Sequence, residues 1–181
     1  MTGQLVAIPA DFLLADDKRV KDLMVSLEDY PHIPQWFSLC QAMDLLQESS
    51  AKFKNGFDTW IGLVFDEKRQ LKGILTPRDI IKGLEHRFFY ETSLTQGYPN
   101  LVLLMKGIRR AGLRDAAQQP VDKVMSPIKV TVNGEAPISQ ALFLMVKEHL
   151  DMMPVNLDHK IAGMISLSDL YKEILKVILG N

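Results

Sequence analysis

The feature that most constrains the fold of this chain is an internal repeat. Three segments recur in the same order in the two halves, with similar residues at matching positions. The matched pairs are residues 20–24 with 121–125, residues 41–43 with 140–142, and residues 73–79 with 163–169. Because preserved order in a self-similar sequence is the signature of duplicated structural units, we expect two copies of one fold. The spacing between matched segments shrinks along the chain, so the first copy carries the longer loops.

Composition excludes several classes of protein. The hydrophobic content of 47% and the charged content of 24% are those of an ordinary folded domain. A formal net charge of −1 provides no general attraction for nucleic acid, so we expect no nucleic-acid partner. The single cysteine, Cys40, excludes an internal disulfide framework and fits a reducing compartment. The longest apolar stretch, residues 101–105, is far shorter than the roughly 20 residues of a membrane span, so we expect a cytoplasmic protein without membrane insertion.

Within each copy the hydrophobic pattern predicts the order strand, helix, strand, strand, helix. In the second copy, residues 129–132 are rich in β-branched side chains and precede a turn signal at Asn133 and Gly134. Positions at helical spacing follow in both copies, at Leu39, Ala42, Met43 and Leu46 and at Leu142, Met145, Val146 and His149 or Leu150. Residues 60–65 and 71–75 read as the two strands of a hairpin, and the second copy shortens the connection to residues 158–160. The pattern predicts an α+β fold.

The segment between the copies, residues 86–119, is too long to be a bare loop in a compact domain. Asn100 suits a helix N-cap, Gly112 suits a helix stop, and an apolar stripe between them predicts a helix, at Leu101, Leu104, Met105 and Ile108. We interpret this helix as a connector that packs on the module or across a dimer interface. Its basic residues, Lys106, Arg109, Arg110 and Arg114, leave open a membrane-surface or partner-docking role.

The segment that closes each copy could carry chemistry. Thr76 stands at a predicted N-cap, Pro77 at the first helical position and Asp79 at the third, and Ser166 and Asp169 repeat the pattern. In one interpretation, the pair is a capping box that only stabilises the helix. In the other, the hydroxyl and the helix N-terminus accept a phosphate, the carboxylate accepts hydrogen bonds from a ribose diol, and Arg78 adds a charged contact. A glycine three residues before each hydroxyl, at Gly73 and Gly163, favours the second interpretation because another group can approach the strand there.

No catalytic set is evident beside this motif. The four histidines, His32, His86, His149 and His159, have no spacing typical of a metal site, and there is no Gly-rich phosphate loop. We therefore predict a protein that is not an enzyme and that requires no cofactor or metal.

The Val-x-x-x-Met start, the hairpin and the Gly-x-x-Thr/Ser-x-x-Asp ending of each copy resemble cystathionine-β-synthase (CBS) domains, which occur in tandem as Bateman modules. The resemblance covers roughly residues 20–178. It implies a first CBS repeat with an N-terminal segment in residues 1–85, a helical connector in residues 86–119 and a second CBS repeat in residues 120–181. It also implies two β-α-β-β-α units packed through their sheets about a pseudo-two-fold axis, with two clefts between them.

The resemblance further implies a regulatory function. Modules of this kind bind AMP, ADP, ATP or another adenosyl ligand such as S-adenosylmethionine, and they often pair as homodimers. The resemblance assigns ribose binding to Asp79 and Asp169 and places Thr76 and Ser166 beside ribose or phosphate. We expect ligand occupancy to be transmitted to an effector protein that the sequence does not identify. The alternative is a ligand-free, dimeric interaction or scaffold module that docks an enzyme or transporter.

The two copies depart from the family pattern in different places. The second copy keeps the Pro-Val pair that many members have at the start of the second strand, at Pro154 and Val155, whereas the first copy has Gly62 and Leu63. Ser168 stands at the position matching Arg78, so the second motif lacks that basic partner. The two motifs are therefore expected to be unequal.

Overall fold

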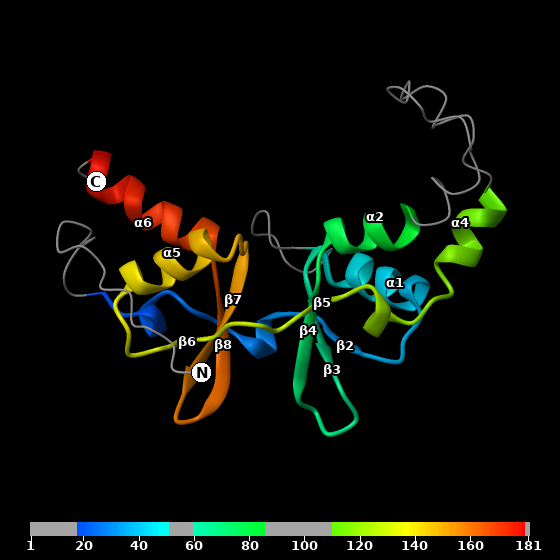
Figure 1. The fold of residues 1–181 in the computed structure, drawn as a ribbon, viewed down its shortest axis with the longest axis horizontal. Helices are drawn as coiled ribbons and strands as arrows, with labels where there is room; N and C mark the ends of the chain where they lie inside the picture. Colours follow the sequence, from blue (N-terminus) through cyan, green and yellow to red (C-terminus); the bar gives the residue numbers. More distant parts are fainter. Residues whose placement is uncertain (1–17, 51–59, 86–109, 180–181) are drawn as a thin grey trace. The chain divides into compact units, whose positions relative to one another are not determined.

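The computed structural model describes residues 18–50, 60–85 and 110–179, which form two compact units (Figure 1). We name each unit after the repeat that supplies most of it. The first unit comprises the described residues between 30 and 127, and the second unit comprises residues 18–29 and 128–179. Each unit holds one four-stranded mixed sheet and its own helices, which confirms the predicted α+β class.

The first unit is a sheet in the order β2-β3-β4-β5 with helices on one face (Figure 1). Strand β2 runs parallel to β3, and the other two pairings are antiparallel. Its elements are β2 (His32–Pro34), α1 (Leu39–Ser50), β3 (Gly62–Phe65), β4 (Leu71–Leu75), α2 (Pro77–Glu85), α4 (Arg110–Ala116), the 3-10 turn η5 (Val121–Lys123) and β5 (Ser126–Pro127). Its core gathers the apolar face of α1 and the inner residues of β3 and β4 around Val121, which is fully buried.

The second unit repeats this arrangement with the sheet order β1-β8-β7-β6. Strand β6 runs parallel to β7, and β7 and β1 are antiparallel to β8. Its elements are η2 (Val20–Asp22), β1 (Val25–Ser26), η3 (Leu27–Asp29), β6 (Val132–Asn133), α5 (Ile138–Lys147), β7 (Met152–Leu157), β8 (Lys160–Ser166) and α6 (Leu167–Leu179). Helices α5 and α6 lie side by side and cover the same core, in which Val20 is fully buried (Figure 1).

The leading segment of each repeat packs in the unit that the other repeat builds. Residues 18–26 belong to the second unit, where the Val20 N–H donates to the carbonyl of Ala136 at 2.9 Å and β1 pairs with β8. Residues 119–127 belong to the first unit, where the Val121 N–H donates to the carbonyl of Phe37 at 2.8 Å and β5 pairs with β4. The repeats read along the sequence are therefore not the units that pack together.

The same exchange completes the N-terminal ends of two helices. The first four N–H groups of a helix have no partner within it. The Leu39 N–H of α1 donates to the carbonyl of Gln119 at 2.9 Å, and the Ile138 N–H of α5 donates to the carbonyl of Lys18 at 3.3 Å. Both helices thus begin against a strand-like segment from the other repeat.

Two local predictions need correction. The strand expected at residues 129–132 is shorter and lies later, at Val132–Asn133, because only these two residues pair with β7. Gly112 does not end a helix but lies inside α4, where an added Cβ would meet nothing within 4 Å. A glycine at such an open position costs the helix only about 1 kcal/mol. The rest of the connector helix predicted from Asn100 lies outside the described residues.

The hairpin connections differ between the units. In the second unit the turn is two residues long, Asp158 and His159, with positive φ angles of 49° and 62°. This left-handed backbone is the one that a two-residue hairpin turn requires. In the first unit the longer connection is held by Asp66, whose carboxylate accepts the N–H groups of Lys68 and Gln70 at 2.9 and 2.8 Å.

Candidate functional site

The second unit presents its closing motif where β8 ends and α6 begins. Ser166 is the last residue of β8, and Asp169 is the third residue of α6. The Ser166 hydroxyl donates to Asp169 Oδ2 at 2.6 Å and accepts the Asp169 N–H at 3.2 Å. Asp169 Oδ1 faces the ammonium group of Lys172 at 3.0 Å. The lysine side chain is 67% exposed, so this ion pair lies at the surface.

The first unit builds the corresponding motif at the start of α2, which begins at Pro77 as predicted. The Thr76 hydroxyl accepts the Asp79 N–H at 3.2 Å, and Asp79 Oδ2 accepts the Thr76 N–H at 2.9 Å. These reciprocal bonds are a capping box. The Thr76 hydroxyl also donates to Asp79 Oδ2 at 2.7 Å. Asp79 is buried, with 7% of its surface exposed, whereas Asp169 is half-buried.

A further donor to Asp79 comes from the leading segment of the second repeat. The Ser126 hydroxyl, on β5, donates to Asp79 Oδ1 at 2.9 Å. Ser126 lies opposite Ile74 in the sheet. The matching position in the second unit, opposite Met164, is Val25, which has no hydroxyl. Asp79 therefore has donors at both oxygens from within its unit, and one of them has no counterpart beside Asp169.

The two motif glycines are explained by packing within each unit. A Cβ on Gly163 would lie 2.5 Å from the carbonyl oxygen of Val25, and a Cβ on Gly73 would lie 2.5 Å from the sulfur of Met125 and 2.8 Å from the carbonyl oxygen of Ser126. The group that approaches each glycine is thus the short strand of the other repeat. Their presence no longer favours a bound ligand over a capping role.

The remaining candidate residue, Arg78, follows Pro77 in α2 and is exposed. Its counterpart Ser168 is exposed as well. The structure thus brings together Thr76 with Asp79 and Ser166 with Asp169, and it leaves Arg78 at the surface beside the first pair. The sequence pattern did not identify Ser126, because its contact with Asp79 spans 47 residues.

One carboxylate near the second motif, that of Glu173, has a lowered pKa. Glu173, one turn after Asp169 on α6, is 8% exposed. The ammonium groups of Lys176 and Lys18 donate to its two oxygens, and these hydrogen bonds hold the pKa of Glu173 below its ordinary value. Lys18 belongs to the leading segment of the first repeat, so this ion pair fastens that segment to α6.

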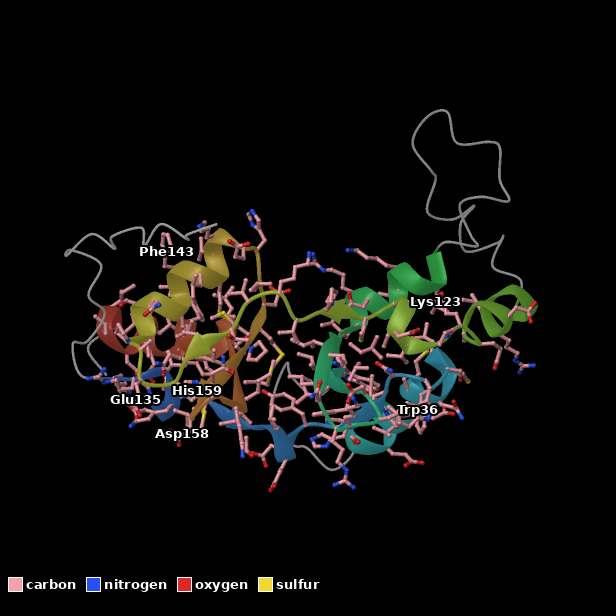
Figure 2. All side chains as sticks on the ribbon, turned by 60° about the horizontal axis from the view of Figure 1, so that its bottom comes forward. Trp36, Lys123, Glu135, Phe143, Asp158 and His159 are labelled. Carbon is pink, nitrogen blue, oxygen red and sulfur yellow. The ribbon has the colours of Figure 1, made fainter. Side chains whose placement is uncertain are left out.

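The described part of each unit also has a hollow outside the Thr76–Asp79 and Ser166–Asp169 pairs. The second unit has a polar hollow of about 610 Å³ at the hairpin end of its sheet, where the labelled Glu135, Asp158 and His159 lie (Figure 2). Ser166 lies at the opposite end of β8. The first unit has an apolar groove of about 420 Å³ whose lining includes Met43 of α1, Ile80 of α2 and Leu113 of α4. Cys40 is half-buried and is also among the lining residues.

A search of residues 18–50, 60–85 and 110–179 found neither a group of three or more metal-ligating side chains nor a helix long and apolar enough to cross a membrane.

Comparison with known proteins relates this geometry to a family. Residues 121–176 match the family model of the CBS domain. The fold is similar to that of a CBS-domain-containing protein from Agrobacterium tumefaciens, with a TM-score of 0.58 and 21% identity, covering 86% of this chain and 92% of that one. It is also similar to the CBS-pair protein CBSX2 from Arabidopsis thaliana, with a TM-score of 0.57 and 19% identity, covering 89% and 96%. CBSX2 has also been solved in complex with AMP.

A sequence relative says nothing further about function, because it is itself uncharacterized. The uncharacterized protein YlbB of Bacillus subtilis is 23% identical over 152 residues, which are 84% of this chain and 79% of YlbB. Residues 121–176 match the CBS domain, and the likeness to CBS-pair structures shows that the chain has their fold. The family match lies in the second repeat, and the first repeat builds the same sheet and helix order around its own core. CBS-domain proteins are generally regulatory modules rather than enzymes.

Proposed function

We propose that this protein is a regulatory module that binds an adenine nucleotide or a related adenosyl ligand at its closing motifs and transmits the occupancy to a partner protein. The observation that carries the proposal is the geometry at the start of α6, where a hydroxyl and a half-buried carboxylate meet a helix N-terminus. A ribose diol can donate to the carboxylate, and a phosphate can accept from the helix N-terminus. The AMP complex of CBSX2 supports the choice of ligand class.

The residues that would bind the ligand are Ser166 and Asp169 in the second unit and Thr76, Arg78 and Asp79 in the first. Ser166 and Thr76 would lie beside ribose or phosphate, and the two carboxylates would bind ribose hydroxyls. The exposed guanidinium of Arg78 would reach a phosphate from the first motif only. We place the protein in the cytoplasm in this proposal, as a homodimer whose ligand is AMP, ADP, ATP or S-adenosylmethionine.

Calorimetric titration tests the proposal. Purified protein, shown to be free of carried-over nucleotide, is titrated with AMP, ADP, ATP and S-adenosylmethionine in parallel. We expect saturable binding of at least one ligand and a loss of at least about tenfold in affinity in Asp169→Ala, because a hydrogen bond to a charged group contributes on the order of tenfold or more. Ser168→Ala, an exposed neighbour on the same turn, is the matched control and should bind as the wild type does.

Two results of the titration would contradict the proposal. Absence of binding by any of the four ligands, in protein whose circular dichroism shows a folded state, would exclude an adenosyl sensor. Equal affinity in Asp169→Ala, Asp79→Ala and the wild type would place the ligand elsewhere, and the closing motifs would then be helix caps alone.

A second candidate function is supported by the surface of α6. Tyr171, Ile178 and Leu179 are 57%, 70% and 63% exposed, which is unusual for three apolar side chains of one helix. Such a face suits a ligand-free module that docks a second copy, an enzyme or a transporter. Analytical ultracentrifugation of the wild type and Tyr171→Ser/Ile178→Ser tests it: a shift to a smaller species would support the docking face, and an unchanged sedimentation coefficient would argue against self-association there.

A further inference from the structure

The carboxylate of Asp79 is almost fully occupied by donors of its own unit. Oδ2 accepts the N–H and the hydroxyl of Thr76, and Oδ1 accepts the hydroxyl of Ser126. An ionised carboxylate offers about four acceptor sites, so three internal donors leave little capacity for another. Asp79 is also buried, which limits the approach of any further donor.

Ser126 is held in place by its strand rather than by its own side chain. It is exposed, but its backbone lies in β5, opposite Ile74 of β4. The next residue of β5, Pro127, lies opposite the motif glycine Gly73. The pairing of β5 with β4 keeps the Ser126 hydroxyl beside Asp79. If the hydroxyl rotated away, the strand would stay in place and the buried carboxylate would lose one hydrogen bond.

The second unit has the same backbone arrangement with a different side chain. Val25 of β1 lies opposite Met164, and Ser26 lies opposite the motif glycine Gly163. Valine donates no hydrogen bond, so Asp169 Oδ1 is instead approached by Lys172. That lysine is 67% exposed and can turn into solvent at little cost, because surface ion pairs contribute little.

We propose that Ser126 makes the two closing motifs unequal: its hydroxyl occupies Asp79 as an internal structural acceptor, so that only the motif of Ser166 and Asp169 binds a ribose diol. This inference rests on the proposed function and narrows its two candidate motifs to one, so that Asp79 would not bind ribose hydroxyls; it also names the residue that decides this. Ser126 acts through Asp79 and is a specificity-determining residue, because it determines whether the first carboxylate is free. A vicinal diol donates two hydrogen bonds to one carboxylate, and only Asp169 can accept both after the displacement of a single surface lysine.

The experiment removes the hydroxyl at position 126 of the first unit and adds one at the matching position 25 of the second unit. Threonine and valine have the same shape and differ by the hydroxyl, so Ser126→Val removes the donor and Ser126→Thr keeps it. In the reverse direction Val25→Thr supplies a donor where the wild type has none. Each protein is titrated calorimetrically with AMP, and circular dichroism verifies folding.

We expect one AMP per chain in the wild type and in Ser126→Thr, with binding lost in Asp169→Asn. Ser126→Val should gain a second site or strengthen a weak one by about tenfold. Val25→Thr should weaken the existing site by a similar factor. Two equal sites in the wild type, or loss of binding in Asp79→Asn with binding intact in Asp169→Asn, would overturn the inference.

A measurement without nucleotide separates this inference from the proposed function. Hydrogen exchange of the amides in residues 74–80 is compared among the wild type, Ser126→Val and Ser126→Thr. Faster exchange by about tenfold in Ser126→Val alone would support the internal role of Ser126. If that acceleration occurs and no protein binds AMP, the nucleotide-binding function fails while the occupation of Asp79 by Ser126 stands. Equal exchange in all three proteins would overturn the role of Ser126, whatever the titrations show.

Discussion

The two closing motifs share the pattern Gly-x-x-Thr/Ser-x-x-Asp and the same strand-to-helix arrangement, yet their carboxylates have different surroundings. Asp79 is buried and accepts hydrogen bonds from Thr76 and from Ser126. Asp169 is half-buried and accepts one from Ser166, with Lys172 at the surface as its second partner. One part of the difference, the Ser126 hydrogen bond, comes from the opposite repeat, so duplication of a motif does not duplicate its surroundings.

The leading segment of each repeat lies beside the closing motif of the other repeat. Because β5 completes the first unit and β1 completes the second, a substitution in one repeat changes the site of the other. Residue 25 therefore acts on the motif at 166–169, and residue 126 acts on the motif at 73–79. The surroundings of the two carboxylates can therefore differ while each repeat keeps its own motif unchanged.

The largest effect is expected from the two core residues that immediately precede the motif hydroxyls. Leu75 and Ile165 are both fully buried, in separate cores. Replacing either with alanine should lower the free energy of unfolding by about 2–5 kcal/mol, because both the transfer of the side chain and the cavity contribute. Urea denaturation measures the loss, and hydrogen exchange tells whether Leu75→Ala loosens the first unit alone. Equal acceleration in both units would show that they unfold as one.

A smaller loss is expected from the motif glycines. Gly163→Ala places a Cβ against the carbonyl oxygen of Val25, and Gly73→Ala places one first against the sulfur of Met125. Both should destabilise by about 1–3 kcal/mol through overpacking. Gly163→Ala should be the more severe, since its Cβ would lie 2.5 Å from the carbonyl oxygen of Val25, whereas that of Gly73→Ala would lie 2.8 Å from the carbonyl oxygen of Ser126, and a backbone carbonyl yields less easily than a methionine side chain. Thermal unfolding of both variants decides the order, and a milder Gly163→Ala would contradict the asymmetry in packing.

The carboxylates themselves offer the most direct test of the comparison. Asp79→Asn places amide hydrogens beside the donors of Thr76 in a buried site, and it should cost about 1–3 kcal/mol. Asp169→Asn loses a surface ion pair and should cost less than about 1 kcal/mol. Chemical denaturation without ligand measures both. Equal losses would mean that burial and the Ser126 contact do not distinguish the two motifs.

The smallest effect concerns pH. The pKa of Glu173 in the folded state lies below its ordinary value of 4.5, chiefly because Lys176 and Lys18 donate to it. The charged form therefore stabilises the second unit above about pH 4.5, and this contribution is lost as the pH falls through the lowered folded-state pKa. Glu173→Gln should lower stability at neutral pH by less than about 1 kcal/mol and should reduce the acid dependence. Urea titrations at neutral and acidic pH compare the two proteins, and parallel pH profiles would exclude this ion pair as a contributor.

Several features of the fold were predictable because they depend on neighbouring residues. Proline after a threonine predicts the first residue of α2, and the hairpin runs predict β3 with β4 and β7 with β8. The short strands β1 and β5 were not predicted, since two residues carry no detectable period. The sequence indicated that Gly73 and Gly163 matter, but it did not show why a side chain is excluded there. That depends on which strand lies beside each glycine.

The sequence by itself determined the duplicated plan, the order of strands and helices in each copy, and the hydroxyl and carboxylate that begin each closing helix. These follow from spacing and capping within a few residues. Only the tertiary structure decided that the leading segments change units, that Ser126 donates to Asp79, and that Val25 leaves Asp169 without such a donor. The reason is physical: a hydrogen bond between residues 47 positions apart depends on which sheet edge each short strand joins, and local propensities do not specify that choice.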